Sequence, residues 1–291
     1  MFGNEADVWV GRQYGPYRIT ELLGRGTVAH VYRAETARGE VAIKVLTPFA
    51  EARGEVRALF EQEYELMARL DHPNVLRVFQ AGVIASTHYM EIELIEGETV
   101  WDKVQREGRL PVEVSIRIVQ QMCSALDHVH EHRIVHRDVK PSNIMLTTDD
   151  RAVLFDFGLS HDLDGPPPPE GRVFGSPLFL APEQAVAGPV DARTDLYSLG
   201  VTLYRLTVGE HPFYGERNDL LHAHLKLDPP DPRPSGVADD LAAVILHAMA
   251  KAPEERFQTG ADFAGALATV DIPDEDHGRK RGFLRRLGSR N

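Results

Sequence analysis

The chain has 291 residues, of which 43% are hydrophobic and 26% charged, and this composition excludes a disordered chain while allowing one large domain or two lobes. Its formal net charge of −12 argues against general nucleic-acid binding, because a phosphate backbone would repel such a surface. The single cysteine, Cys123, excludes an intrachain disulfide and suits a reducing compartment.

Most of the first hundred residues are expected to form β-strands. Apolar and polar residues alternate along 17–23, and the segment 40–46 is rich in β-branched residues. One helix is expected among the strands, because Phe60, Tyr64 and Met67 recur at helical spacing. The expected strands cover residues 17–23, 28–33, 40–46 and 88–95.

Beyond Gly97 the apolar pattern becomes helical. Apolar residues form wide stripes in four segments, at 118–129, 196–206, 241–249 and 263–267. A small lobe rich in strands followed by a helical lobe is an α+β arrangement, with a cleft in which ligands usually bind. We therefore divide the chain into an N-terminal extension, a small lobe, a large lobe and a C-terminal tail, at residues 1–16, 17–95, 96–272 and 273–291.

Two features of the small lobe suggest phosphate binding. Gly24 and Gly26 lie in a turn between strands, where glycines let the backbone approach phosphate oxygens, although glycine pairs in strand turns are also common. Lys44 lies on an otherwise apolar strand, and a buried ammonium requires anionic partners. Glu63 on the helix is one candidate partner and a nucleotide phosphate is the other. A solvent-facing lysine remains the alternative.

The most specific pattern is the string HRDVKPSN at 136–143, followed by DFG at 156–158. Phosphoryl transfer needs a carboxylate that orients the attacking hydroxyl, a cation on the moving phosphoryl group and oxygen ligands for Mg²⁺. Asp138 can supply the carboxylate and Lys140 the cation. Asn143 and Asp156 can supply the metal ligands. This combination is not expected from a structural loop.

With these motifs, the chain resembles a Hanks-type, eukaryotic-like serine/threonine protein kinase from about Tyr17 to Val270, most closely the bacterial members. The resemblance implies a bilobal kinase fold with an ATP cleft between a small sheet lobe and a helical lobe. It also implies that Glu63 holds Lys44. The residues to which it assigns structural or regulatory roles are His136, Arg137, Phe157, Ser176, Glu183, Asp195 and Arg256.

Several of these roles are specific. In the family, an aspartate placed as Asp195 anchors the catalytic loop, and a glutamate placed as Glu183 pairs with an arginine placed as Arg256. By the same resemblance Ile92 is the gatekeeper, and the hinge 93–95, with Glu93 and Ile95 at its ends, hydrogen-bonds adenine. The residues expected to enclose the base are Val31, Ala42 and Met145.

The catalytic loop also indicates the substrate. Serine/threonine kinases that resemble this chain carry a lysine where Lys140 stands, and Ser176 replaces a more usual threonine whose hydroxyl bridges base and lysine. We expect ATP- and Mg²⁺-dependent phosphorylation of protein serine or threonine hydroxyls, with Mn²⁺ as a possible substitute metal. A pseudokinase that binds partners without catalysis is the alternative. The sequence does not indicate an oligomeric state.

The activation segment departs from the family pattern. Between His161 and Gly175 the sequence contains no Ser, Thr or Tyr, although Arg137 belongs to the pocket that in many relatives receives an activation-loop phosphate. Our hypothesis is that the segment is ordered without a phosphate, with Arg137 partly neutralised by a nearby carboxylate. The candidates are Asp162, Asp164 and Glu170.

Two further segments carry open alternatives. Four consecutive prolines at 166–169 predict a stiff surface loop, or a ligand for an SH3-like groove. The tail 278–291 carries six basic and no acidic residues, which leaves the rest of the chain at −18. It could contact an anionic membrane surface or remain a solvated end. No apolar run approaches a membrane span, and no signal-peptide pattern opens the sequence, so we expect a cytoplasmic protein.

Overall fold

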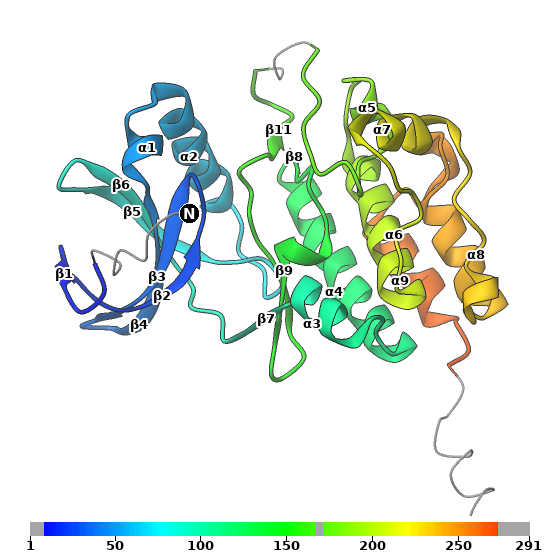
Figure 1. Ribbon diagram of the computed structural model, residues 1–291, viewed down its shortest axis with the longest axis horizontal. Coiled ribbons are helices and arrows are strands. Elements are labelled where there is room, and N and C mark those ends of the chain that lie inside the picture. The colour runs from blue at the N-terminus through cyan, green and yellow to red at the C-terminus, as the bar shows by residue number, and fades with distance from the viewer. Residues whose placement is uncertain (1–8, 167–170, 273–291) are drawn as a thin grey trace, which may run out of the picture.

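The computed structural model describes residues 9–166 and 171–272. They form two lobes, a small one dominated by a sheet and a large one dominated by helices (Figure 1). This is the α+β, two-lobed arrangement that the sequence predicts. The prolines at 167–169, the residue Glu170 and the basic tail lie outside the described residues. No helix within the described part of the chain is long and apolar enough to cross a membrane.

The small lobe is built on a six-stranded antiparallel sheet with the order β1-β2-β3-β4-β6-β5. One face of the sheet buries a cluster that includes Tyr17, Ile43 and Tyr89, as expected for strands whose alternate residues face a core. The strands are β1 (Gln13–Tyr14), β2 (Tyr17–Arg25), β3 (Ala29–Thr36), β4 (Gly39–Leu46), β5 (Val78–Ile84) and β6 (Thr87–Ile92).

A short helix, α1 (Pro48–Glu51), leads into the main helix of the small lobe, α2 (Gly54–Met67). The buried face of α2 carries Phe60, Glu63 and Met67, which follow the i, i+3, i+7 spacing of one helical face. The sequence therefore places a carboxylate among apolar residues on the side of α2 that faces the rest of the lobe.

The large lobe is organised around two long helices, α4 and α6, that contact each other. The stretch of α6 from Thr194 to Thr207 is buried, so its apolar character on all sides reflects a central position. Asp191 caps its first turn, and Gly209 ends it in a left-handed conformation. The helices are α3 (Val100–Glu107), α4 (Val112–Glu131), α5 (Pro182–Ala185), α6 (Ala192–Val208), α7 (Arg217–Lys226), α8 (Asp239–Ala248) and α9 (Gly260–Ala268).

Short strands and 3₁₀ turns support the loops at the interface of the lobes. They form a three-stranded sheet, β10-β9-β7, and a two-stranded sheet, β11-β8. The strands are β7 (Gly97–Thr99), β8 (Ile134–Val135), β9 (Ile144–Thr147), β10 (Ala152–Leu154) and β11 (His161–Asp162). The 3₁₀ turns are η1 (Pro141–Asn143), η2 (Arg233–Ser235) and η3 (Pro253–Glu255).

The structure differs from the expected elements in several places, including the short strands β7 to β11 and the helix α7. The strand expected at 88–95 ends at Ile92, and residues 93–96 connect the lobes without regular structure. Strand β5 was not expected, because its Gln80 and Gly82 interrupt the apolar pattern. Helix α3 was also not expected, because only its residues Val100 and Val104 are buried, too few to show a period.

Close packing between α6 and α8 gives a testable prediction. A Cβ added to Gly200 would lie 2.7 Å from the Cβ of Ala248, so Gly200→Ala should lower the free energy of unfolding by about 1–3 kcal/mol through overpacking. Thermal unfolding would measure this. Gly265→Ala on α9 is the matched control, because nothing lies within 4 Å of its added Cβ. Equal Tm values for the two variants would contradict the packing argument.

Candidate active site

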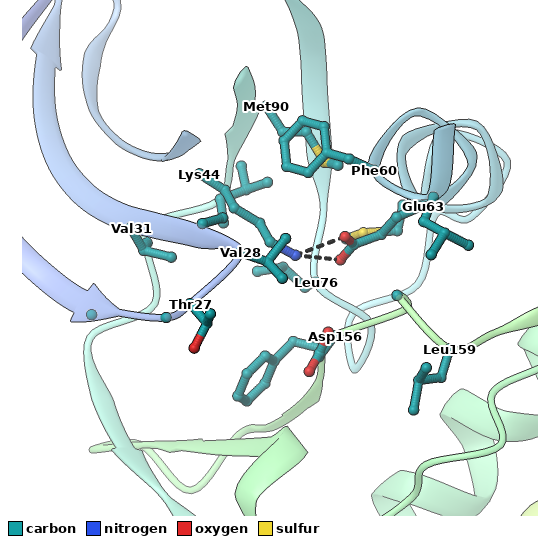
Figure 2. A pocket seen from close by; sticks show the side chains of 18 of the residues that line it. Thr27, Val28, Val31, Lys44, Phe60, Glu63, Leu76, Met90, Asp156 and Leu159 are labelled. Carbon is teal, nitrogen blue, oxygen red and sulfur yellow. Dashed lines mark hydrogen bonds and ion pairs between the residues drawn. The ribbon is translucent and has the colours of Figure 1, made fainter. Parts of the chain in front are cut away.

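A cavity of about 620 Å³ opens between the glycine turn, β4, α2 and the segment after Phe155 (Figure 2). Five of the residues predicted to bind a nucleotide line it, namely Gly24, Gly26, Val31, Lys44 and Ile92. Glu63 and Asp156 line it as well, together with apolar side chains such as Leu76 and Met90. The cavity thus combines an apolar wall with a small group of charges, as small-molecule sites commonly do.

Four of the predicted nucleotide-binding residues are not among those that line this cavity, although they lie in neighbouring elements. Ala42 pairs with Ile92 between β4 and β6, and Met145 pairs with Thr99 between β9 and β7. The side chain of Glu93 forms an ion pair of 2.6 Å with Arg151. Ile95 packs against the core at the connection of the lobes.

The cation in the cavity is Lys44. Its Nζ donates to both carboxylate oxygens of Glu63 at 2.7 Å, which joins β4 to α2, as Figure 2 shows. Burial alone would lower the pKa of Lys44, but the carboxylates of Glu63 and Asp156 outweigh it, so the pKa is raised. Lys44 is therefore an ammonium group at neutral pH, held where a nucleotide phosphate could replace part of its anionic environment. The sequence predicts Glu63 or a nucleotide phosphate as the anionic partner of Lys44, and the structure adds Asp156 as a second carboxylate.

The carboxylate of Asp138 is held by three groups. Lys140 Nζ donates to its Oδ2 at 2.6 Å, and the backbone N–H of Ser176 donates to its Oδ1 at 2.9 Å. Lys140 also donates to the Ser176 hydroxyl at 2.6 Å, so Ser176 links the two residues as expected, although its N–H rather than its hydroxyl bonds to Asp138. Asn143 Nδ2 donates to the backbone carbonyl of Asp138 at 2.9 Å and to its Oδ2 at 3.1 Å.

These contacts set the charge state of Asp138. Burial would raise its pKa, but hydrogen bonding and charge attraction from Lys140, with smaller contributions from Ser176 and His136, more than offset this effect. The pKa of Asp138 is therefore lowered, and the group is a carboxylate over the whole physiological range. A carboxylate in this state can accept a hydrogen bond, and then a proton, from a bound hydroxyl group.

Asp195 on α6 fixes the backbone that precedes Asp138. Its Oδ2 accepts the N–H of His136 and its Oδ1 accepts the N–H of Arg137, both at 2.8 Å. His130 Nε2 lies 2.8 Å from Oδ2, a contact that the motif reading missed because His130 lies on α4, outside every motif. Arg137 has a φ of 64°, a left-handed conformation that a non-glycine residue adopts only when its surroundings hold it there.

The segment with Asp156 is tied to the catalytic loop. The N–H of Phe155 donates to the carbonyl of Asn143 at 3.0 Å. Because Asp156 directly follows Phe155, this bond holds the backbone of Asn143 near that of Asp156. Phe157 is buried and packs edge-to-face against His136, with ring centroids 4.8 Å apart. Asp156 itself has a φ of 66°, a second held left-handed residue at this site.

Glu183 and Arg256 form the ion pair that the resemblance implies, with the arginine side chain fully buried. Arg256 donates to the two carboxylate oxygens of Glu183 at 2.9 and 2.8 Å, a two-pronged geometry that fixes orientation as well as charge. Thr194 also donates to Glu183 at 2.7 Å. The ion pair attaches the segment around Ala181 to the residue that follows η3, and the bond from Thr194 attaches it to the start of α6.

The hypothesis on the neutralisation of Arg137 is wrong for two of its three candidates. Asp162 pairs with Arg69 at 2.6 Å, and Asp164 pairs with Arg133 at 3.3 Å. Each aspartate therefore has a different arginine as its partner, supplied by a segment far away in the sequence. The third candidate, Glu170, lies outside the described residues.

Comparison with known proteins agrees with this geometry. Residues 17–263 match the protein kinase domain model. The chain belongs to the protein kinase family. A kinase called PknB from Mycobacterium leprae is 36% identical over 265 residues, which cover 87% of this chain and 43% of the relative. PknD from Mycobacterium tuberculosis is 34% identical over 275 residues, covering 92% of this chain and 41% of the relative. Both relatives are named serine/threonine-protein kinases.

Solved structures show the same kinase fold. The PknI kinase domain of Mycobacterium tuberculosis superposes with a TM-score of 0.69 at 30% identity, covering 89% of this kinase chain and 97% of that one. The chain spans less than half the length of the curated relatives that it matches.

The contacts of Asp138 predict a pH effect. Lys140→Met removes the ammonium that lowers the pKa of Asp138 and leaves the opposing effect of burial. The acid limb of kcat/KM should therefore move to higher pH, while Lys140→Arg, which keeps a positive charge, should move it less. Rates measured from acid to neutral pH at the same ATP concentration would test this, because the titration of ATP is common to all the variants. An acid limb at the same pH in Lys140→Met would contradict the assignment.

Proposed function

We propose that this kinase transfers the γ-phosphate of ATP to serine or threonine hydroxyls of protein substrates. The observation that carries the proposal is the ionised carboxylate of Asp138, held by Lys140 and Ser176. Asp138 does not line the cavity of Lys44, but its loop is bonded through Asn143 to Phe155, which lines that cavity together with Asp156. A carboxylate of lowered pKa is a weak base, so its main contribution is to orient the hydroxyl and to receive its proton as the new P–O bond forms.

The nucleotide would occupy the cavity between the lobes. Lys44, oriented by Glu63, would bind the α- and β-phosphates, and the backbone at Gly24 and Gly26 would approach the phosphate oxygens. Adenine would lie at the apolar end of the site and hydrogen-bond the backbone of the hinge, residues 93–95. The residues proposed to contact the base are Val31, Ala42, Ile92, Glu93, Ile95 and Met145.

The donor set suits magnesium. Asp156 supplies a carboxylate and Asn143 an amide oxygen, which are hard ligands of the kind that Mg²⁺ prefers and that Mn²⁺ also accepts. Within the described residues, no group of three or more His, Cys, Asp or Glu side chains is placed to hold a metal ion. A metal held by these two residues would therefore need phosphate oxygens and water to complete its coordination. Its chemistry would be to neutralise charge on the phosphates.

The residues of the chain then have distinct tasks. Asp138 accepts the proton of the substrate hydroxyl while the bond between the β- and γ-phosphates breaks. Lys140, 2.6 Å from Asp138, places positive charge beside the group that is transferred. Ser176 holds Lys140 through its hydroxyl and Asp138 through its N–H. The segment that follows, residues 177–183, would offer a surface for the substrate peptide.

Loss of the carboxylate separates this proposal from a pseudokinase. Asp138→Asn should lower kcat by about 10²–10⁴-fold, because an amide cannot take up the proton, while nucleotide affinity stays unchanged. Transfer of labelled γ-phosphate to a protein substrate and binding of a fluorescent nucleotide would measure the two effects. Removal of divalent metal with a chelator should also stop transfer. Nucleotide binding with equal, background-level transfer in both proteins would instead favour the pseudokinase.

We further propose a cytoplasmic location, supported by the single buried cysteine. The basic tail supports contact with anionic lipid, since each basic residue near such a surface contributes about 1 kcal/mol. Co-sedimentation with vesicles containing anionic phospholipid should fall when residues 278–291 are removed. Equal sedimentation of the full and shortened chains would show that the tail is a solvated end.

A further inference from the structure

The guanidinium of Arg137 has an unusual environment for its position. Its Nε donates to the carbonyl of Leu159 at 2.6 Å, and its Cζ lies 5.0 Å from the centroid of the Phe174 ring. Across residues 9–166 and 171–272, Arg137 forms no ion pair with a carboxylate. The positive charge beside the catalytic loop is therefore in contact with an aromatic face, an arrangement that stabilises a cation when water is partly excluded.

The backbone around Phe174 is held in place for this contact. Gln184 Nε2 donates to the carbonyls of Arg137, at 2.9 Å, and of Phe174, at 3.2 Å. Gly175 has a φ of 108°, and a Cβ added there would lie 2.9 Å from the carbonyl oxygen of Arg137. A single amide and a glycine thus fix the chain so that the Phe174 ring meets Arg137. Phe174 is also only two residues before Ser176, whose N–H holds Asp138.

The sequence leaves few hydroxyl groups for a phosphate at Arg137. From Asp156 to Glu183 only Ser160 and Ser176 carry one. Ser160 is buried, and its Oγ donates to the carbonyl of His136 at 3.4 Å. Ser176 already receives the hydrogen bond of Lys140. Phosphorylation of either residue would remove a contact that the site uses.

We propose that Phe174 is a positioning residue whose ring contacts the guanidinium of Arg137 in place of an activation-segment phosphate. The kinase then reaches its full rate without phosphorylation of this segment. The proposal rests on the kinase activity proposed above. Through Phe174, the charge of Arg137 holds residues 173–176 close to the catalytic loop. The N–H of Ser176 is then already directed at Asp138 before any substrate binds. Two ion pairs, Asp162 with Arg69 and Asp164 with Arg133, hold the first part of the same segment.

Substitutions at Phe174 separate the aromatic contact from simple packing. Phe174→Ala and Phe174→Leu should each lower kcat about tenfold, because neither offers a π face, whereas Phe174→Tyr should stay within about twofold of wild type. KM for ATP should stay unchanged, since Phe174 is not among the residues that line the cavity of Lys44. Arg137→Gln should lower kcat less in Phe174→Ala than in wild type, because the contact between the two side chains is already lost and only the bond to Leu159 remains to be broken.

Phe79→Ala is the matched control. Phe79 is 45% exposed on β5 and has the guanidinium of Arg77 at 5.8 Å from its ring, so its removal deletes a similar contact away from the cleft. Its kcat should equal that of wild type. Thermal unfolding of each variant would identify any loss of rate that comes from unfolding. Phe174→Leu keeps most of the apolar volume of the side chain, so we expect this variant to stay folded.

Phosphatase treatment completes the test. Wild-type kinase treated with a serine/threonine phosphatase, which is then removed, should show an unchanged initial rate on a peptide substrate. A fall in that rate together with the loss of a phosphate mapped to Ser160 or Ser176 would overturn the proposal, as would full activity of a folded Phe174→Leu or Phe174→Ala. An inactive wild type would instead refute the proposed kinase activity, so failure of one idea is distinguishable from failure of the other.

Discussion

The carboxylate of Asp195 holds the backbone on which the catalytic loop depends. It is fully buried and accepts the N–H groups of His136 and Arg137. A buried carboxylate without donors would cost several kcal/mol, so the loop and the carboxylate stabilise each other. The left-handed backbone of Arg137 follows from these bonds, and it turns Asp138 toward Lys140 and Ser176. The central helix α6 therefore determines where the catalytic carboxylate lies.

Much of this arrangement could be predicted from the sequence, because its chemistry lies in short strings with fixed spacing. Lys44 on a buried strand requires an anion, and Glu63 on the buried face of α2 supplies it at 2.7 Å. The same holds for Asp138 with Lys140, whose two-residue spacing places them side by side. Such pairs are predictable because burial of a charge leaves few acceptable partners.

The remaining contacts depend on tertiary structure, which no local pattern records. His130 reaches Asp195 from the last turns of α4, where it reads as an ordinary polar residue. The carboxylates of Asp162 and Asp164 were candidates for Arg137 because they lie in the activation segment, which in many relatives supplies the phosphate for this arginine. In the fold, Arg69 and Arg133 reach these carboxylates from other elements. Arg137 contacts the aromatic ring of Phe174 instead. A search of the sequence for carboxylate partners could not predict this contact.

Arg69 has a consequence for how inhibitors can bind. It follows α2 directly, donates to the carbonyl of His132 and pairs with Asp162 at 2.6 Å. Compounds that select a kinase shape in which α2 has swung outward would have to separate this arginine from two partners in the large lobe. They would meet a resistance that is absent where no such arginine follows α2. Compounds that fill only the adenine end of the cleft would not meet it, so the two chemical classes should differ in potency against this kinase.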